Sequence, residues 1–402
     1  MKAGCQRAIL AGFGVLVLWL MLRGLDSSGL RSGTPRPAGQ VAPQLSGCFD
    51  IAVLLAPDGS LWEWGNLRSS THAGSGVERE LVPVPRRLGS SRDWVAVSRS
   101  SSHGLALKSD GSLWGWCPHG NRPLGPNVPL ITREPVLLSE ERDWVRVHAG
   151  NGWSLAIKQD RSLWAWGRNQ FGMVGDGTTQ TRNTPFRVGG VARWREISTT
   201  FQGTFGIQED GSLWAWGLPW QRGEPWMIPR RIEEATRCTH LAGGNFQVGL
   251  RTDGSIQPLF DNGTIHLGSE VLAGPWTEAE MGIASCLLTR DAKGQWWGSG
   301  DQPFGQLGIG HGRVARKPEL ISGADEDVWA IRNLGDTTLF LMRDGTLWQC
   351  GKRLGVPPRN PWVVRAARWF NQLPPWLRGS KSLYDKEFSA DSIPRKVWSL
   401  PD

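Results

Sequence analysis

The sequence lacks the short motifs that mark common catalytic and metal-binding sites. It contains no H-E-x-x-H metalloprotease motif, no P-loop, no G-x-S-x-G motif and no EF-hand loop. Its seven histidines are scattered, with no pair at i and i+4 that could hold a metal from one helix face. We therefore expect a non-enzymatic protein with no catalytic residue, no cofactor and no metal site.

Cysteine is also sparse, with six residues and no C-x-x-C pair. Cys117, Cys238 and Cys350 occupy positions that carry glycine or tryptophan in other copies of an internal repeat described below. Such positions favour small buried hydrophobic side chains over a disulfide framework.

Long basic runs are absent. The formal net charge of +8 favours acidic partners in general. No five Lys or Arg residues are consecutive, however, so the positive charge is diffuse. Because nucleic-acid binding requires a basic stripe or a recognisable module, we expect no nucleic-acid partner.

The one long hydrophobic run lies at the N-terminus. Residues 8–22, AILAGFGVLVLWLML, carry no charge and are followed at once by Arg23. This length suits the apolar core of a signal peptide and is slightly short for a membrane-spanning helix. No A-x-A-like cleavage site follows, so we favour an uncleaved hydrophobic signal-anchor helix in residues 1–23 over a signal peptide. Residues 24–41, rich in Gly, Ser and Pro, are expected to form a flexible linker.

Tyrosine is nearly absent, whereas tryptophan is abundant: the chain has one Tyr and 24 Trp, with 52 Gly and 26 Pro. A phrase of the type DGSLWAWG accounts for many of the tryptophans and recurs seven times, at intervals of 38 to 53 residues. Repeats of this period indicate a repeat architecture. The aspartates that align the copies are Asp58, Asp110, Asp160, Asp210, Asp253, Asp291 and Asp344.

Each copy predicts a β-hairpin. An apolar segment such as SLAIK (154–158) precedes an Asp-Gly pair, which we expect to form a tight two-residue turn, and a segment such as SLWAWG returns as the second strand. Strand alternation places Trp214 and Trp216 on one face and Leu213 and Ala215 on the other. Both faces are apolar, so the tryptophans are expected to fill seams between neighbouring units.

Two further strands complete the unit. A P-x-x-V/L/I segment recurs at 135–138, 185–188, 229–232 and 318–321. Segments that open with Trp144 and Trp194 supply another strand nine residues after the proline. Four short antiparallel strands with both faces buried predict the blades of an all-β, seven-bladed propeller over residues 42–402, and the period-2 alternation excludes helical solenoids.

Closure of the ring requires a strand at its junction. The first copy (41–59) lacks an evident proline strand, while IPRKV (393–397) matches IPRRI (228–232). We therefore expect the ring to be closed by pairing of the N- and C-terminal segments, because an open propeller would expose two apolar edges.

These repeats resemble the regulator-of-chromosome-condensation (RCC1) repeat family. The best-preserved copies are residues 160–188 and 293–321, and the resemblance extends from about 41 to 397. The fifth copy, 253–268, has lost its tryptophans, and only two copies keep the full Gly-rich loop. The resemblance implies the propeller fold more firmly than any activity.

The family includes a nucleotide exchange factor for a small GTPase, E3-ligase modules and a secreted inhibitor of β-lactamase. We expect a monomeric protein-binding or scaffold propeller that is tethered to a membrane through residues 8–22, faces the extracytoplasmic side and binds an unknown protein through loops on one face. The alternatives are an exchange-factor-like regulator of a small GTPase and a secreted inhibitor of an extracellular enzyme, and secretion is the alternative localisation.

The most distinctive segment outside the repeat is an insertion at about 355–390 in the last copy. Its alternating Trp and Arg residues suit a protein partner or a membrane interface, and a cap packed across one end of the propeller is the structural alternative. The candidate contact residues are Arg359, Trp362, Arg365, Arg368, Trp369, Trp376 and Arg378.

Overall fold

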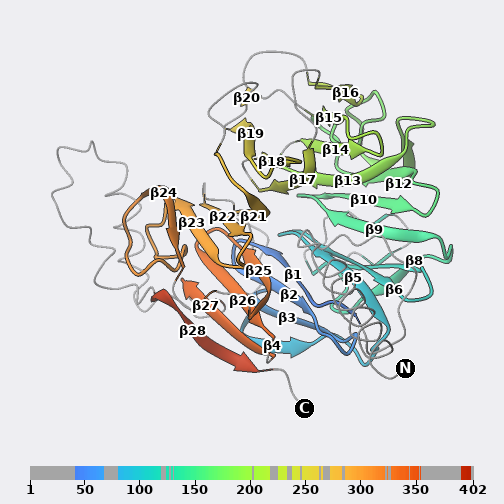
Figure 1. Ribbon diagram of the computed structural model, residues 1–402. Helices are drawn as coiled ribbons and strands as arrows, with labels where there is room; N and C mark the ends of the chain where they lie inside the picture. Colours follow the sequence, from blue (N-terminus) through green and yellow to red (C-terminus); the bar gives the residue numbers. More distant parts are fainter. Residues whose placement is uncertain are drawn as a thin grey trace, which may run out of the picture.

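Seven four-stranded antiparallel sheets surround a central axis in the computed structural model (Figure 1). The seven-bladed, all-β propeller predicted from the repeats is confirmed. The structure describes residues 41–67, 80–118, 124–125, 128–129, 131–201, 203–217, 225–232, 238–244, 247–261, 264–265, 272–282, 286–321, 324, 327–343, 345–352, 354 and 391–399. The expected N-terminal helix of residues 1–23 lies outside these ranges. The part of the chain that is described holds no helix able to cross a membrane.

Each blade is formed by four strands that are consecutive in the sequence. Blade 1 contains β1 (Gln44–Cys48), β2 (Ile51–Leu55), β3 (Leu61–Asn66) and β4 (Leu81–Arg87). Blade 2 contains β5 (Trp94–Arg99), β6 (Gly104–Lys108), β7 (Leu113–Trp116) and β8 (Val136–Ser139). Blade 3 contains β9 (Trp144–Ala149), β10 (Trp153–Lys158), β11 (Leu163–Gly167) and β12 (Arg182–Val188). Blade 4 contains β13 (Trp194–Thr199), β14 (Thr204–Gln208), β15 (Leu213–Trp216) and β16 (Arg230–Arg231).

The remaining three blades follow the same order. Blade 5 contains β17 (Cys238–Gly243), β18 (Gln247–Arg251), β19 (Ile256–Asp261) and β20 (Thr264–Ile265). Blade 6 contains β21 (Trp276–Met281), β22 (Cys286–Asp291), β23 (Trp296–Gly300) and β24 (Ala315–Leu320). Blade 7 contains β25 (Val328–Asn333), β26 (Thr337–Met342), β27 (Thr346–Gly351) and β28 (Asp391–Ser399).

The repeated Asp-Gly phrase forms a three-residue hairpin loop, so the predicted two-residue turn is wrong. In blade 1 the amide of Gly59 donates to the carbonyl of Ala56, and the amide of Ala56 donates to the carbonyl of Ser60. Gly59 has a φ of 79°, whereas Asp58 has no positive φ. A type I turn followed by one left-handed residue explains this pattern, because it needs a single positive φ instead of two.

A side-chain network explains why the phrase contains Asp, Ser and Trp. In blade 4, Asp210 Oδ1 accepts hydrogen bonds from the Ser212 amide at 2.9 Å and the Ser212 hydroxyl at 2.5 Å. Trp214 Nε1 then donates to Ser212 Oγ at 2.8 Å. Blades 1, 2 and 3 repeat the same chain of contacts. The motif therefore ties the turn to the third strand in these four blades.

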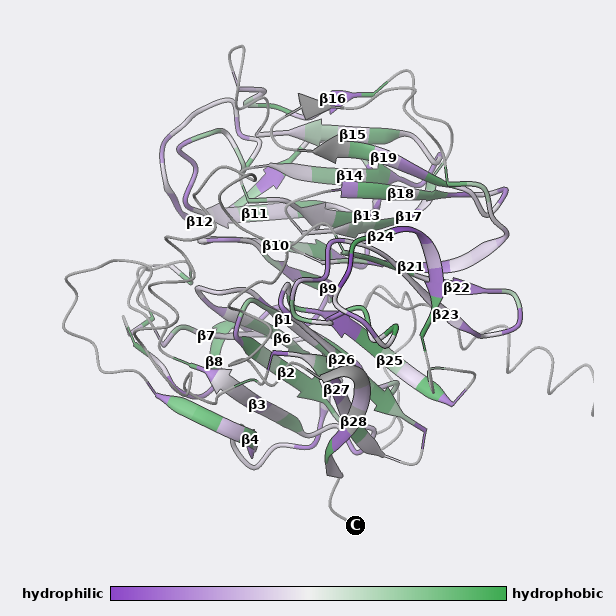
Figure 2. Ribbon diagram, turned by 90° about the vertical axis from the view of Figure 1, so that its left-hand side faces the viewer, coloured by the Kyte–Doolittle hydropathy of each residue, from purple (hydrophilic) through white to green (hydrophobic). Residues whose placement is uncertain are grey.

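The two faces of that third strand pack into different seams. Trp216 is fully buried with blade 3 residues such as Leu155, while Leu213 and Ala215 pack with Leu241 of blade 5. The predicted role of tryptophan in the seam is confirmed for Trp216. Inner strands such as β2 and β26 are accordingly apolar (Figure 2).

The predicted pairing of the N- and C-terminal segments does not occur. The C-terminal strand β28 pairs with β27 inside blade 7, and the N-terminal strand β1 pairs with β2 inside blade 1. The ring closes through side-chain packing between these blades, which lie side by side in Figure 1. Trp62 and Trp398 meet there with ring centroids 5.1 Å apart. Closure by packing suffices because every blade already has four strands of its own.

Blade 1 also has the proline strand that its sequence seemed to lack. Strand β4 contains Pro83 and Pro85 and pairs with β3. Residues 85–88, PRRL, fit the same P-x-x-L pattern, and Trp94 follows Pro85 by nine residues as in other copies. The expectation that the first copy lacks this strand is therefore wrong. Val41, placed at the end of the expected linker, is buried, and its amide donates to the Pro57 carbonyl.

The described cysteines are thiols, and most of them are buried, as expected. Cys117, Cys238, Cys286 and Cys350 are buried, and Cys48 is half-buried. Burial raises the pKa of the Cys286 thiol to about 12 and that of Cys238 to about 11. These side chains therefore stay protonated and act as small core residues.

Candidate binding site at the mouth of the central channel

The first strands of all seven blades converge on a cavity at one end of the central channel. The cavity has a volume of about 130 Å³ and is lined by the last residues of these strands and the loops that follow them. The Asp-Ser-Trp turns lie at the opposite ends of the same blades, because they connect the second and third strands. The two faces of the propeller therefore differ, and we call the face that carries the cavity the mouth.

Two phenylalanines stand at the mouth. Phe49 lies in the turn between β1 and β2, and Phe201 follows β13, so they come from the first and fourth blades. Their rings make an edge-to-face contact with centroids 5.8 Å apart. Phe49 is 41% exposed and Phe201 is 39% exposed, although both are large apolar side chains. Phe49 also has a φ of 53°, an unfavourable value for a residue other than glycine.

An ion pair lies beneath the phenylalanines. Glu280 Oε1 of blade 6 lies 2.8 Å from Arg332 Nη1 of blade 7, and the Glu280 side chain is buried. Burial raises the pKa of Glu280, and the neighbouring Arg332 opposes that shift. Arg332 Nε also points to the Gly47 carbonyl at 3.5 Å, so this guanidinium contacts blades 6 and 1 from blade 7. The side chain of Arg332 remains 28% exposed.

A neutral histidine lines the same cavity from blade 3. His148 Nε2 lies 3.0 Å from Thr199 Oγ1 of blade 4. Burial lowers the pKa of His148 to about 4, with a further contribution from Arg332. The imidazole is therefore uncharged at neutral pH and can act as a hydrogen-bond donor or acceptor.

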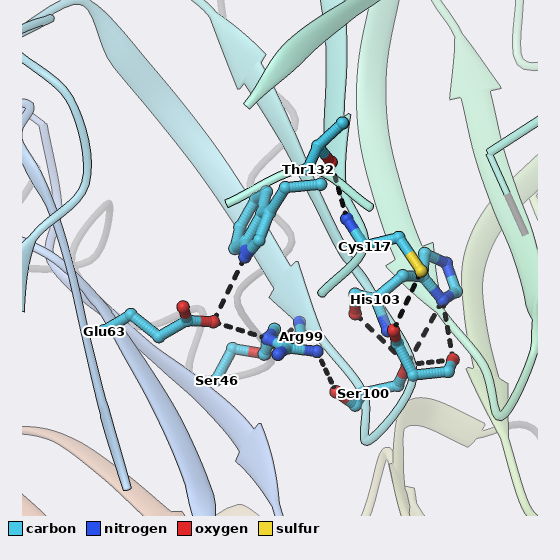
Figure 3. A network of polar contacts seen from close by, with 9 residues as sticks. Ser46, Glu63, Arg99, Ser100, His103, Cys117 and Thr132 are labelled. Atoms are coloured by element: carbon cyan, nitrogen blue, oxygen red, sulfur yellow. Dashed lines mark hydrogen bonds and ion pairs between the residues drawn. The ribbon is translucent and has the colours of Figure 1, made fainter. Parts of the chain in front are cut away.

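Behind the cavity, a buried ion pair joins blades 1 and 2 (Figure 3). Arg99 Nε lies 2.7 Å from Glu63 Oε1, which also accepts a hydrogen bond from Trp116 Nε1 at 3.1 Å. The backbone amide of Arg99 donates to Ser46 Oγ at 2.8 Å. These contacts hold the end of β5 against β1 and so position one wall of the cavity.

His103 connects blades 2 and 3 in the same layer (Figure 3). Its Nδ1 lies 2.9 Å from Ser102 Oγ, and its Nε2 lies 2.9 Å from Ser154 Oγ. Burial lowers its pKa to about 3, with a smaller effect from Arg99. A fully buried, neutral imidazole between two hydroxyls is a structural link across the seam.

The mouth residues were not predicted from the sequence. A usable signal exists in the alignment of the copies, because Ser98, His148, Ser198, Ala242, Glu280 and Arg332 are each the fifth residue of the first strand in blades 2 to 7. This position holds small residues in three blades and ionisable residues in the other three. A departure from the repeat at a position near the axis thus marks the site.

The predicted contact residues of the insertion lie outside the described residues. These are Arg359, Trp362, Arg365, Arg368, Trp369, Trp376 and Arg378. The two strand ends that flank the insertion are described: Gly351 pairs with Asp391. Lys352 Nζ lies 3.4 Å from Asp50 Oδ1, next to Phe49. Gly351, Lys352 and Asp391 therefore lie on the mouth side of blade 7.

No group of three or more His, Cys, Asp or Glu residues that could hold a metal ion occurs within the described ranges. The donors at the mouth are mainly guanidinium, hydroxyl and amide groups. Their chemistry suits binding of a ligand rich in acceptor atoms.

Comparison with known proteins supports the family resemblance. The protein-family model described as "Regulator of chromosome condensation (RCC1) repeat" matches residues 160–200. This segment runs from the turn before β11 to the end of β13, so the sequence repeat spans parts of two blades. The chain is an RCC1-like propeller.

Several solved structures are similar to this RCC1-like propeller. The crystal structure of human WBSCR16 is similar with a TM-score of 0.59 and 17% identity, over 71% of this chain and 83% of that one. Prp20p from Saccharomyces cerevisiae, a protein studied for its binding to Gsp1p and histones, is 16% identical with a TM-score of 0.46, over 73% and 66% of the two chains. The ectodomain of the Arabidopsis thaliana receptor kinase ACR4 is 10% identical with a TM-score of 0.48, over 77% and 95%. No curated protein sequence matches the chain.

Proposed function

We propose that this RCC1-like propeller is a non-enzymatic, monomeric protein-binding module that engages its partner at the mouth. One observation carries the proposal: Phe49 and Phe201 form an exposed aromatic pair over a cavity to which all seven blades contribute. Aromatic side chains and arginine are enriched at the centre of protein interfaces.

The insertion supports the choice of face. Gly351 and Asp391, the paired residues on either side of the insertion, lie on the mouth side of blade 7. We propose that a partner docked on Phe49 and Phe201 also contacts the Trp and Arg residues of the insertion.

Two features support a non-enzymatic role. The recurrent Asp, Ser and Trp residues are engaged in the turn-to-strand network of blades 1 to 4. His103 and its serine neighbours have the spacing of a nucleophile and base, but His103 is fully buried and its contacts include no carboxylate. A nucleophile–base pair needs an orienting group and access for a substrate.

Affinity capture tests the proposed face. Residues 40–402 serve as bait, beside a Phe49→Ala/Phe201→Ala variant and a variant lacking residues 356–390. The deletion leaves four residues between Gly351 and Asp391, a usual hairpin length, so β27 and β28 stay joined. Val191→Ala is the matched control, since Val191 is 92% exposed and lies beside the Asp-turn face.

We expect the same protein to be captured by the unaltered bait and the Val191→Ala control, and lost from the phenylalanine variant. Equal capture by all baits would place the interface elsewhere. Capture of a small GTPase whose nucleotide release the propeller accelerates would instead favour the exchange-factor alternative.

We also propose that residues 8–22 tether the propeller to a membrane, with the propeller on the extracytoplasmic side; the uncharged run of apolar residues supports this. The native protein should resist high-salt extraction from membranes and retain its N-terminus. A mature form that begins near residue 28 and is released by salt would favour the secreted alternative.

A further inference from the structure

We propose that the mouth cavity is a binding site for a carboxylate group carried on a small apolar body. The proposal deepens the proposed function. It rests on that function only because both place the ligand at the mouth. The carboxylate can belong to a free molecule or to the acidic residue of a protein partner, and the experiments below separate these sources.

One guanidinium of the cavity wall can reach an anion. Arg332, whose side chain is 28% exposed, and the neutral imidazole of His148 line the cavity, while Glu280 is the carboxylate among its lining residues and the guanidinium of Arg99 is fully buried behind the wall. Both guanidiniums lie close enough to the half-buried Cys48 to counteract the rise that burial causes in its pKa. Glu63 compensates Arg99 from behind, and Glu280 compensates Arg332 from one side.

Arg332 retains capacity for a ligand. A guanidinium carries five N–H groups, and those of Arg332 contact Glu280 through Nη1 and Gly47 through Nε. The part-exposed guanidinium can therefore offer Nη2 to an incoming oxygen while the pair with Glu280 persists. A guanidinium in a partly desolvated site recognises carboxylates well, because its fork of parallel N–H groups matches their two oxygens.

The remaining wall defines the rest of the ligand. Leu45, Val97, Val147 and Ile331 line the cavity between the polar groups, and the Phe49–Phe201 pair stands over it. A volume of about 130 Å³ admits a group the size of one side chain or one small ring. Benzoate combines the required carboxylate, apolar body and size, and it is the probe we choose.

Titration of purified residues 40–402 with benzoate, followed by tryptophan fluorescence and NMR shift changes, tests the site. We expect saturable binding that is about tenfold weaker for the neutral analogue benzamide, because a hydrogen bond to a charged group is lost. Arg332→Gln should weaken benzoate binding by about tenfold or more. Arg316→Gln, on the exposed outer strand β24, is the matched control and should leave binding unchanged.

Glu280→Gln gives the sharper test, because it removes the carboxylate that competes for Arg332. We expect benzoate to bind this variant more tightly than the unaltered protein. The double variant Glu280→Gln/Arg332→Gln leaves no unpaired buried charge, so it should fold and yet lose binding even if Arg332→Gln alone unfolds. Near-ultraviolet circular dichroism checks the fold of each variant.

The proposal is overturned if benzoate does not bind, if benzamide binds equally, or if Glu280→Gln weakens binding. Millimolar benzoate added to the affinity capture separates the two sources: displacement of the partner identifies a carboxylate of the partner, and undisturbed capture with benzoate bound identifies a free ligand. Because the titration needs no partner, its failure is distinct from a failure of the proposed protein-binding function.

Discussion

At the scale of single residues, position along a strand decides what each tryptophan does. Trp214 is half-buried and donates to Ser212 beside the Asp turn, whereas Trp216 is fully buried and donates to the Met173 carbonyl across the seam at 2.8 Å. Two residues of the same type, two positions apart on one face, thus serve the hairpin and the seam respectively. Neither tryptophan lies at the mouth, so the recurrent aromatic phrase is structural.

The third copy of the repeat contains a residue-scale conflict that can be relieved. Arg161 has a φ of 69° at the turn position where six other copies carry glycine. A non-glycine residue in this conformation is disfavoured by about 1 kcal/mol. We expect Arg161→Gly to raise the free energy of unfolding in urea by about 0.5–1 kcal/mol.

Arg161→Ala is the control for this experiment. It removes the ion pair between Arg161 Nε and Glu209 Oε1 (3.3 Å) but keeps the strained backbone. It should therefore be less stable than Arg161→Gly. Equal stabilities of the two variants would show that the backbone conformation carries no cost.

Buried histidines should make the propeller sensitive to acid. His103 has its pKa lowered to about 3 by burial, while in an unfolded chain it takes up a proton near pH 6.5. Between these values the unfolded state binds more protons, so the stability contributed by neutral His103 is complete above about pH 6.5 and decreases as the pH falls. His148, with a pKa of about 4, has the same sign.

We expect the melting temperature of the unaltered protein to fall more steeply between about pH 6.5 and 4.5 than that of His103→Gln. The variant should be less stable at pH 7, because it loses the hydrogen bonds to Ser102 and Ser154. His311→Gln, a part-exposed histidine, is the control. Parallel profiles for His103→Gln and the unaltered protein would contradict the assignment.

At the scale of strands and blades, the fifth blade has lost its tryptophans and packs through smaller side chains. Its outermost strand β20 has two residues, and the seam with blade 6 is built from smaller side chains such as Ala242, Val248 and Ala279. The tryptophan of that seam, Trp276, is only partly buried. The blade still forms, because its side chains still alternate between the two faces of each strand and its turn keeps the Asp253–Ser255 contact.

Hydrogen exchange should reveal the weaker packing of blade 5. We expect amides of the central strand β18 in blade 5 to exchange about tenfold faster than those of β10 in blade 3, because local opening exposes less apolar surface there. Peptide-resolved hydrogen–deuterium exchange at neutral pH is the measurement. Equal protection of the two strands would mean that the ring opens only as a whole.

At the scale of the whole molecule, the junction between blades 7 and 1 holds the ring closed. Leu45 and Leu54 of blade 1 pack with Leu339 and Leu341 of blade 7, and β28 adds Trp398 against Trp62. Arg332 and Lys352 reach from blade 7 to β1 and its turn. The junction thus resembles the other seams in its chemistry.

Removal of residues 391–402 should open this junction. The truncation takes away β28, exposes the edge of β27 and uncovers Trp62. We expect a lower melting temperature, increased binding of a hydrophobic dye and concentration-dependent association in size-exclusion chromatography. The variant lacking 356–390 retains β28 and should behave as the unaltered protein; the same defects there would assign them to the insertion instead.

Much of the fold could be predicted from the residues, because each blade is specified locally. The alternation in SLWAWG, the glycine after Asp210 and the proline strands each occur in most regions of the chain that form a blade. Closure could not be predicted, because the pairing of β28 with β27 spans an insertion.

The candidate site was missed for a related reason. Phe49 belongs to blade 1 and Phe201 to blade 4, and Glu280 and Arg332 lie in different repeats. Alternation assigns a side chain to a face of its strand, but it does not say which residue of another copy faces it across the axis.

The sequence by itself determined the number of blades, the strand order and the burial of seam tryptophans such as Trp216, since strand period and turn chemistry act between residues that are close along the chain. Only the tertiary structure decided how the ring closes, which charged groups pair across the seams and where the mouth cavity lies. These features depend on contacts between blades, and in a ring those contacts are set once all seven blades have packed together.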